Sequence, residues 1–205
     1  MDASKSIEQN NSRMKTTHIR RDRISKKNEE SEMLIPIGHF VIVNRKKYKK
    51  KYPIIRIHGL GSCISLILLD TPNKIFAMTH ILLPSSDVNI SNTIRFPQKY
   101  ANLAVKDLVA EIKKEGACLS NLQAILVGGS KIFRYSSNHI GEENAKVIRE
   151  ELQKQKIKII KEDIGGSKGR NVLFDVGKML IMTRKTGQNE FIILYREDNK
   201  NEEEK

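Results

Sequence analysis

Two residues able to carry out nucleophilic chemistry lie in neighbouring apolar segments of this chain. Cys63 precedes the apolar run Ile64–Leu69, and His80, seventeen residues later, lies within a second apolar segment, Ile75–Leu83. The short Asp70–Asn73 turn between these segments predicts a β-hairpin, on which the thiol and the imidazole can lie side by side. An imidazole that removes the proton of a thiol produces a thiolate, which attacks acyl carbons.

The same two residues also fit a structural role, because buried cysteines and histidines are common in protein cores. The residues before Cys63 favour the chemical role. Gly59, Gly61 and Ser62 predict a sharp turn, since glycine adopts backbone conformations that other residues avoid. Backbone N–H groups freed by such a turn can form an oxyanion hole. The sequence therefore predicts a thiol-dependent site in which Cys63 is the nucleophile, His80 is the base, and the turn at Gly61 and Ser62 binds the oxyanion.

Five sequence blocks, in this order, resemble the chemoreceptor glutamine deamidase family, CheD. They are LGSC followed by THILLP, KYANLAVKDLV (99–109), GGSKIF (128–133), IGEENAKVI (140–148) and EDIGGSKGRNVLFDVGKML (162–180). The resemblance extends over about residues 34–195, most of the chain. It implies an enzyme that hydrolyses the side-chain amides of particular glutamines on methyl-accepting chemotaxis receptors and releases ammonia. Some members also cleave glutamyl methyl esters, and none of this chemistry needs a cofactor.

One position of the family's active site differs in this chain. The family's threonine, six residues before the cysteine, corresponds to Ile57. Because isoleucine neither donates nor accepts a hydrogen bond, the group that orients His80 is either missing or supplied elsewhere. The nearby polar candidates are Thr79, Ser62 and His58. Loss of an orienting group reduces the activity of a catalytic unit strongly. A second function therefore stands beside the enzyme: a non-catalytic or weakly catalytic module that binds and stimulates a CheC-type phosphatase, as the resemblance implies.

The net charge of +13 raises nucleic-acid binding as a third function. Residues 45–51 read RKKYKKK, six positive charges in seven residues, between strands expected at Ile37–Val43 and Pro53–Ile57. This pattern predicts a basic hairpin loop. No aromatic platform or groove-reading motif accompanies it, so we expect no nucleic-acid partner. Two roles remain open: a lysine-rich loop that keeps a sheet edge soluble, and a patch that attracts acidic receptor bundles.

The rest of the composition excludes several other classes of site. No apolar run reaches the length of a membrane span and the first thirty residues hold no signal-peptide core, so we expect a cytoplasmic protein without membrane insertion. The two cysteines fit a reducing compartment, and Cys118, after a predicted helix, is expected in the core. Because the chain has no CxxC and no histidine cluster, we expect no metal site.

Hydrophobic periodicity predicts an α+β fold. Residues 1–33 are expected to be a disordered polar extension, 34–196 one deamidase-like domain, and 197–205 a frayed charged tail. Helices are predicted at Tyr100–Glu115 and Glu142–Gln153, together with about eight strands joined mostly by hairpins. This pattern favours a sheet-rich core with helices packed on one side. The layered α/β/β sandwich that the resemblance implies, similar to deamidating toxin catalytic domains, agrees with it.

Two Gly-Gly segments complete the list of candidate site elements. Gly128 and Gly129 end a predicted buried strand, where bare backbone either lines a pocket or forms a tight turn. Residues Glu162–Arg170 contain the second pair but lack the spacing of a phosphate-binding loop, so we expect a mobile loop at the rim of the site.

Overall fold

The computed structural model describes residues 32–48, 51–86, 96–131 and 139–197 of the 205-residue chain. Residues 1–31 of the predicted extension, residues 198–205 of the predicted tail and the tip of the basic loop lie outside the described residues. Within the described part, the first strand includes Glu32 and Met33, two residues before the predicted start of the domain.

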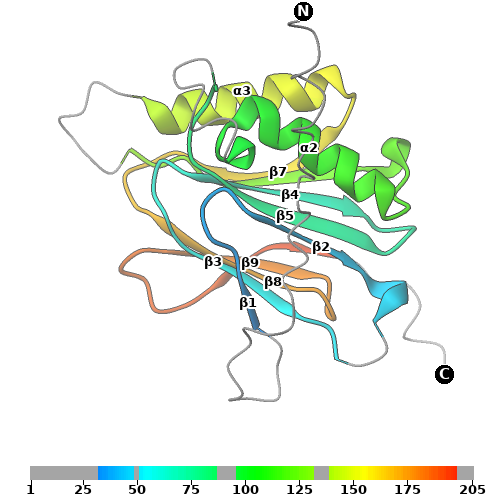
Figure 1. Cartoon of the computed structure of the whole chain (residues 1–205). Helices are drawn as coiled ribbons and strands as arrows, with labels where there is room; N and C mark the ends of the chain where they lie inside the picture. Colours follow the sequence, from blue (N-terminus) through cyan, green and yellow to red (C-terminus); the bar gives the residue numbers. More distant parts are fainter. Residues whose placement is uncertain (1–31, 49–50, 87–95, 132–138, 198–205) are drawn as a thin grey trace, which may run out of the picture.

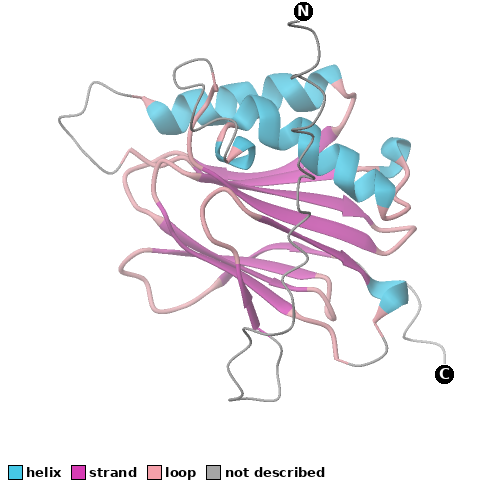
Figure 2. Cartoon of the chain, in the orientation of Figure 1, coloured by secondary structure: helices cyan, strands magenta, loops and turns pink. Residues whose placement is uncertain are grey.

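The described chain forms three layers, with two helices above one sheet and a second sheet below it (Figure 2). The helices are α2 (Ala101–Lys114) and α3 (Ile140–Lys154). The central sheet has the order β2 (Phe40–Asn44), β5 (Ile75–Ile81), β4 (Ile64–Asp70), β6 (Gln123–Gly128) and β7 (Lys158–Ile164). The outer sheet has the order β1 (Glu32–Leu34), β3 (Ile54–Leu60), β8 (Arg170–Asp175), β9 (Leu180–Lys185) and β10 (Ile192–Arg196). Short 3-10 turns lie at Arg45–Lys47, Pro97–Lys99 and Leu119–Asn121. The predicted α+β class and the α/β/β layering are confirmed, with both helices on one side (Figure 1).

Strand β4 is the middle of the molecule and is buried along its whole length. It pairs antiparallel with β5 on one side and with β6 on the other. Because successive side chains of a strand point to opposite faces, Leu66 and Leu68 join the helix-side core, whereas Ile67 and Leu69 join the core between the sheets. A strand covered on both faces needs an almost continuous apolar sequence, which explains the run from Ile64 to Leu69.

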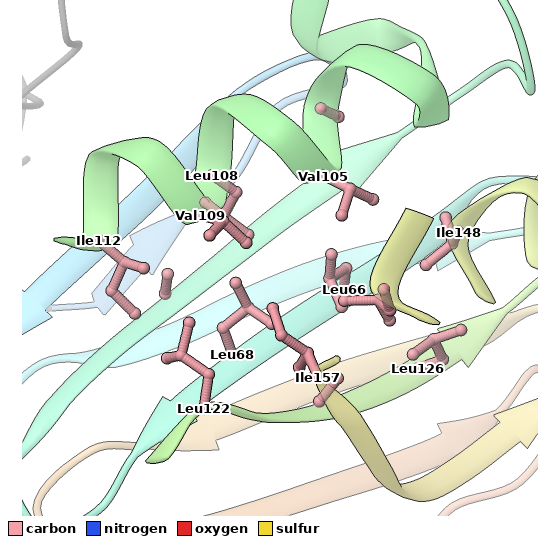
Figure 3. Close-up of a cluster of buried hydrophobic side chains, with 14 of the residues drawn as sticks. Leu66, Leu68, Val105, Leu108, Val109, Ile112, Leu122, Leu126, Ile148 and Ile157 are labelled. Atoms are coloured by element: carbon pink, nitrogen blue, oxygen red, sulfur yellow. The ribbon is translucent and has the colours of Figure 1, made fainter. Parts of the chain in front are cut away.

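The helix-side core follows from the helical period of α2. Val105, Leu108 and Ile112 are fully buried and point from α2 toward Leu66 and Leu68 of β4 (Figure 3). Spacings of three and four residues place these side chains on one face of a helix. Gly116, with φ of +100°, follows the end of α2 in the left-handed conformation that glycine adopts most easily. The predicted helix and its end are confirmed.

The basic loop at 45–51 is not a hairpin loop, contrary to the sequence-based prediction. Strand β2 belongs to the central sheet beside β5, and β3 belongs to the outer sheet between β1 and β8. The loop therefore passes from one sheet to the other. The physical reason is that Val41 and Val43 of β2, and Ile55 and Ile57 of β3, all bury their side chains in the core between the sheets. The two strands face each other across that core instead of pairing edge to edge.

Cys118 is exposed, which corrects its predicted place in the core. Its backbone N–H donates to a carboxylate oxygen of Asp70 at 2.7 Å, and its thiol contacts the Ser120 hydroxyl at 3.1 Å. The hydrogen bond to Asp70 thus fixes the backbone of Cys118, while the residue itself is exposed at the surface. Both cysteines are free, as the sequence predicts for a chain without a structural disulfide.

Asp70 joins the β4–β5 turn to the segment after α2, and its carboxylate is fully buried. It accepts hydrogen bonds from Asn73, from the backbone of Cys118 and from Asn121. Burial alone raises the pKa of Asp70, but these hydrogen bonds outweigh burial and hold the pKa below its ordinary value. The group therefore stabilises the fold only while it is ionised.

We predict that Asp70→Ala lowers the free energy of unfolding by about 2–4 kcal/mol at pH 7, since it leaves several buried donors without an acceptor. Because the folded-state pKa is depressed, the stabilisation is present above the unfolded pKa of about 3.9 and is lost as the pH falls through the folded value. Urea unfolding at pH 7 and at decreasing pH measures both effects. Asp70→Asn is the control, and an equal acid dependence in this variant and the wild type contradicts the prediction.

Candidate active site

Cys63, the residue before β4, and His80 of β5 lie on the same face of the β4–β5 hairpin. In the β4–β5 ladder Ser65 is opposite His80, so Cys63, two residues before Ser65, is the diagonal neighbour of His80. Diagonal neighbours on one face of an antiparallel pair lie about 7–8 Å apart, within the reach of side chains. Both side chains are buried, with 9% and 6% of their surfaces exposed. The hairpin register therefore places the predicted nucleophile and the predicted base on the same face of the hairpin, as buried diagonal neighbours.

The imidazole of His80 is oriented by a backbone carbonyl. Its Nδ1 lies 3.3 Å from the carbonyl oxygen of Ile35, a buried residue between β1 and β2. Because a carbonyl oxygen only accepts hydrogen bonds, Nδ1 carries the proton and the neutral ring has its lone pair at Nε2. Nε2 is buried and has no hydrogen-bond partner within the described part of the chain. This tautomer leaves Nε2 free to take up a proton.

Burial shifts the pKa values of Cys63 and His80 in the directions that favour their neutral forms. It raises the pKa of the Cys63 thiol above its ordinary value, opposed only by a local backbone hydrogen bond. It also lowers the pKa of His80, opposed by the hydrogen bond to the Ile35 carbonyl. A low-dielectric environment disfavours the charged form of either group. Both pKa shifts thus favour a neutral thiol on Cys63 and a neutral imidazole on His80 near neutral pH.

Three hydrogen bonds hold the turn that precedes β4. The backbone N–H of Ser130 donates to the Gly61 carbonyl at 2.7 Å, and the backbone N–H of Gly129 donates to the Cys63 carbonyl at 2.9 Å. Between them, the side-chain amide of Asn144 donates to the Ser62 carbonyl at 2.9 Å. Three successive carbonyls are thus occupied. The N–H groups of Ser62 and Cys63 donate to no backbone carbonyl among the described residues.

Gly128 and Gly129 line this turn, which explains the first Gly-Gly pair. A Cβ atom on Gly128 would lie 2.2 Å from the carbonyl oxygen of Cys63, and the φ of Gly128 is +121°. Only glycine satisfies both conditions. The bare backbone therefore permits close approach of β6 to the cysteine turn.

The second Gly-Gly segment is tied to the same region by a buried arginine. The Arg170 guanidinium donates to the Ser130 hydroxyl and to the carbonyls of Gly165 and Lys168, and it forms an ion pair with Asp163 at 2.8 Å. Lys131 also donates its backbone N–H to the Gly166 carbonyl. These contacts anchor residues 165–170 beside the strand that ends in Gly128, where the sequence predicts a mobile rim loop.

The polar candidates for orienting His80 lie elsewhere. The Thr79 hydroxyl donates to the carbonyl of His39 at 2.9 Å, and strand alternation places it on the opposite face of β5 from His80. His58 is exposed near the end of β3, and Ser62 contributes its carbonyl to Asn144. Ile57 is fully buried in the core between the sheets.

Three participants were not identified from the sequence: the Ile35 carbonyl, the Asn144 amide and Ser65. Ser65 is fully buried opposite His80, and its hydroxyl has no partner within the described residues. The position of Ser65 could have been noticed in the sequence, because it places a hydroxyl group inside the apolar run Ile64–Leu69. The Ile35 carbonyl gives no signal, because every residue has one.

The structure also bears on metal binding and on membrane-spanning helices. Among the described residues, no group of three or more histidine, cysteine, aspartate or glutamate side chains is placed to hold a metal ion. In the same part of the chain, neither helix has the length and apolar content needed to cross a membrane.

An α/β/β sandwich with a thiol and an imidazole between its sheets defines the structural class of this protein. Residues 82–185 match the family model described as CheD chemotactic sensory transduction. The chain is 34% identical over 157 residues to the chemoreceptor glutamine deamidase CheD of Thermotoga maritima, covering 77% of this chain and 94% of that protein. A probable chemoreceptor glutamine deamidase CheD of Syntrophomonas wolfei is 39% identical over 143 residues, covering 66% and 85%. One from Clostridium botulinum is 38% identical over 138 residues, covering 64% and 84%.

The chain belongs to the CheD family.

We predict that Gly128→Ala lowers the free energy of unfolding by at least about 3 kcal/mol, because the new Cβ collides with the Cys63 carbonyl in addition to straining the backbone. Gly165→Ala is the matched control. Its φ is +80° with nothing within 4 Å of the new Cβ, so it isolates the backbone strain at about 1–2 kcal/mol. Denaturant titrations compare the two variants, and equal losses would contradict a steric conflict at the cysteine turn.

Proposed function

We propose that this protein hydrolyses the side-chain amide of glutamine residues on chemotaxis receptors, with Cys63 as nucleophile and His80 as general base. The observation that carries the proposal is the placement of a buried thiol diagonal to an imidazole whose Nε2 has no hydrogen-bond partner among the described residues. Family membership supplies the substrate class, because the matched relatives are named chemoreceptor glutamine deamidases. No cofactor is required for this reaction.

The reaction begins with both groups neutral. As Sγ of Cys63 approaches the carboxamide carbon, Nε2 of His80 takes the thiol proton and the amide oxygen becomes an oxyanion. Collapse of the tetrahedral intermediate breaks the carbon–nitrogen bond, and His80 returns the proton to the departing ammonia. Water, deprotonated by His80, then hydrolyses the thioester to glutamate and restores the thiol. Glutamyl methyl esters, which lose methanol in place of ammonia, follow the same course.

In this mechanism the Ile35 carbonyl takes the orienting role that the family assigns to threonine. Its hydrogen bond with Nδ1 fixes the tautomer in the resting state. It also stabilises the imidazolium that forms during attack, because the partial negative charge of the oxygen lies against the protonated ring. Ile57 is then compatible with catalysis, since the hydrogen bond to His80 comes from a different segment.

The oxyanion is bound by the N–H groups of Ser62 and Cys63. The carbonyls of this turn already accept hydrogen bonds, which fixes the orientation of its peptide groups. The two N–H groups themselves donate to no backbone carbonyl in the described part of the chain. Donors fixed before the reaction stabilise the developing charge without reorganisation.

A second candidate function, binding and stimulation of a CheC-type phosphatase, is favoured by the isoleucine at position 57. This role requires a surface and no catalytic thiol. Cys63→Ala separates the two functions, because it removes the nucleophile from the core and leaves the exposed faces unchanged.

We predict that Cys63→Ala abolishes ammonia release from a receptor cytoplasmic fragment, and that His80→Gln lowers the rate by a factor of about 10²–10⁴. Cys118→Ser is the control and retains full activity, since its thiol is exposed and lies on the α2–β6 connection. A coupled ammonia assay measures the rates. Residual turnover by Cys63→Ala would remove the thiol from the mechanism.

Ile57→Thr tests whether the family threonine is still needed. Because Ile35 already orients His80, we expect a change in kcat of less than about fivefold, with stability reduced by about 1–2 kcal/mol for the buried hydroxyl. Ammonia release and urea unfolding are compared with the wild type. A gain of a hundredfold or more would show that orientation of His80 is incomplete in the natural protein.

The pH dependence follows from the two pKa directions. Since burial lowers the pKa of His80, the acid limb of kcat/KM should lie below about pH 6.5. Since burial raises the pKa of Cys63, alkylation of Cys63 by iodoacetamide in a Cys118→Ser protein should still accelerate above pH 9. A plateau of the alkylation rate near neutral pH would instead indicate a preformed thiolate–imidazolium pair.

A further inference from the structure

Asn144 connects the two halves of the active site through one side-chain amide. It lies on α3, is fully buried, and donates to the Ser62 carbonyl at 2.9 Å and to the Leu82 carbonyl at 3.0 Å. Ser62 immediately precedes Cys63, and Leu82 follows His80 by two residues. Both partners are acceptors, so the amide nitrogen must face them. One NH₂ group therefore holds the nucleophile segment and the base segment at a fixed separation.

The bond to Ser62 also fixes the direction of an N–H group. The carbonyl of Ser62 and the N–H of Cys63 belong to the same planar trans peptide, in which they point in opposite directions. A donor that holds this carbonyl from the α3 side therefore aims the Cys63 N–H away from α3. Donation to the carbonyl also polarises the peptide and strengthens the N–H as a donor.

Two features of the structure accompany this position of Asn144: close packing of the first turn of α3, and a buried amide oxygen without a hydrogen-bond partner among the described residues. A Cβ atom on Gly141, in the first turn of α3, would lie 2.4 Å from the carbonyl oxygen of Gly129, so this turn packs directly on the Gly128-Gly129 backbone. The Oδ1 atom of Asn144 is buried and has no partner among the described residues. A buried amide that is only half satisfied is unfavourable for stability, and such groups in native proteins call for a functional explanation.

We infer that Asn144 is a positioning residue for the deamidation reaction, which orients the Cys63 N–H as an oxyanion donor and fixes the Cys63 turn relative to the His80 strand. This inference rests on the proposed function and adds to it a residue that contacts neither the substrate nor the reacting atoms. It predicts that loss of Asn144 slows steps that pass through a tetrahedral oxyanion more than it slows alkylation of Cys63, which forms no oxyanion and depends on Asn144 only through the position of the thiol relative to His80.

Two small reagents separate these effects without a receptor. p-Nitrophenyl acetate acylates the thiol: His80 takes the thiol proton as a bond forms between Sγ and the carbonyl carbon, the ester bond breaks through a tetrahedral oxyanion, and p-nitrophenolate leaves. Iodoacetamide alkylates the same thiol by displacement of iodide, with no oxyanion. All proteins carry Cys118→Ser, because the exposed thiol would react with both reagents. The readout is the ratio of the acylation rate to the alkylation rate.

For Asn144→Ala we expect this ratio to fall about tenfold or more; the loss of an oxyanion-hole donor itself costs a factor of about 10²–10³ in kcat, and Asn144 orients such a donor without being one. Ile148→Ala is the matched control: Ile148 is fully buried one turn further along α3 and belongs to the helix-side core, so its loss destabilises the protein and leaves the ratio unchanged. If Asn144→Ala does not fold, Asn144→Ser, which keeps one donor, should lower the ratio by a smaller factor.

An unchanged ratio in a folded Asn144 variant overturns the inference while the proposed function stands, and so does an equal fall for Ile148→Ala. The proposed function is tested in the same experiment. If the Cys118→Ser protein releases p-nitrophenolate no faster than the Cys63→Ala, Cys118→Ser blank, Cys63 is not a nucleophile, and both the proposed function and the role of Asn144 are rejected.

Discussion

The burial of β4 on both faces is the constraint on which the rest of this structure depends. The apolar side chains on one face of the strand are buried by the two helices, and those on the other face are buried by the outer sheet. Burial of both rows is favourable because it removes apolar surface from water. The same strand follows directly from the cysteine turn. Cys63, the residue before this fully buried strand, therefore shares the low dielectric of the core between the sheets.

That location determines the chemistry of the candidate site. Burial disfavours both the thiolate of Cys63 and the imidazolium of His80, so in the proposed reaction proton transfer accompanies attack on the substrate. The polar groups to which the proposed reaction assigns roles are mostly backbone atoms: the Ile35 carbonyl for the imidazole, and the N–H groups of Ser62 and Cys63 for the oxyanion. Backbone groups are suitable here because their directions are fixed by the sheets around them, and they need no additional polar side chains in the core.

The helix layer has a role beyond covering the central sheet. Through Asn144, α3 contacts the segments that carry Cys63 and His80, and through Gly141 it packs on the backbone that supports the cysteine turn. Arg170 completes the support from the other side by joining Ser130 to residues 163–168. The candidate site is therefore assembled from all three layers, although Cys63 and His80 come from one hairpin.

The sequence by itself determined the local elements and the pairing of the two reactive residues. Periodicity located both helices, and the Asp70–Asn73 turn predicted the hairpin that makes Cys63 and His80 diagonal neighbours. Tertiary structure alone decided that β2 and β3 belong to different sheets, since each strand shows the same alternation whichever sheet it joins. It also decided the partners of the site. Ile35 lies 45 residues from His80, and Ser62 lies 82 residues from Asn144. Contacts over such separations leave no local pattern, because they depend on how the layers pack and not on neighbouring residues.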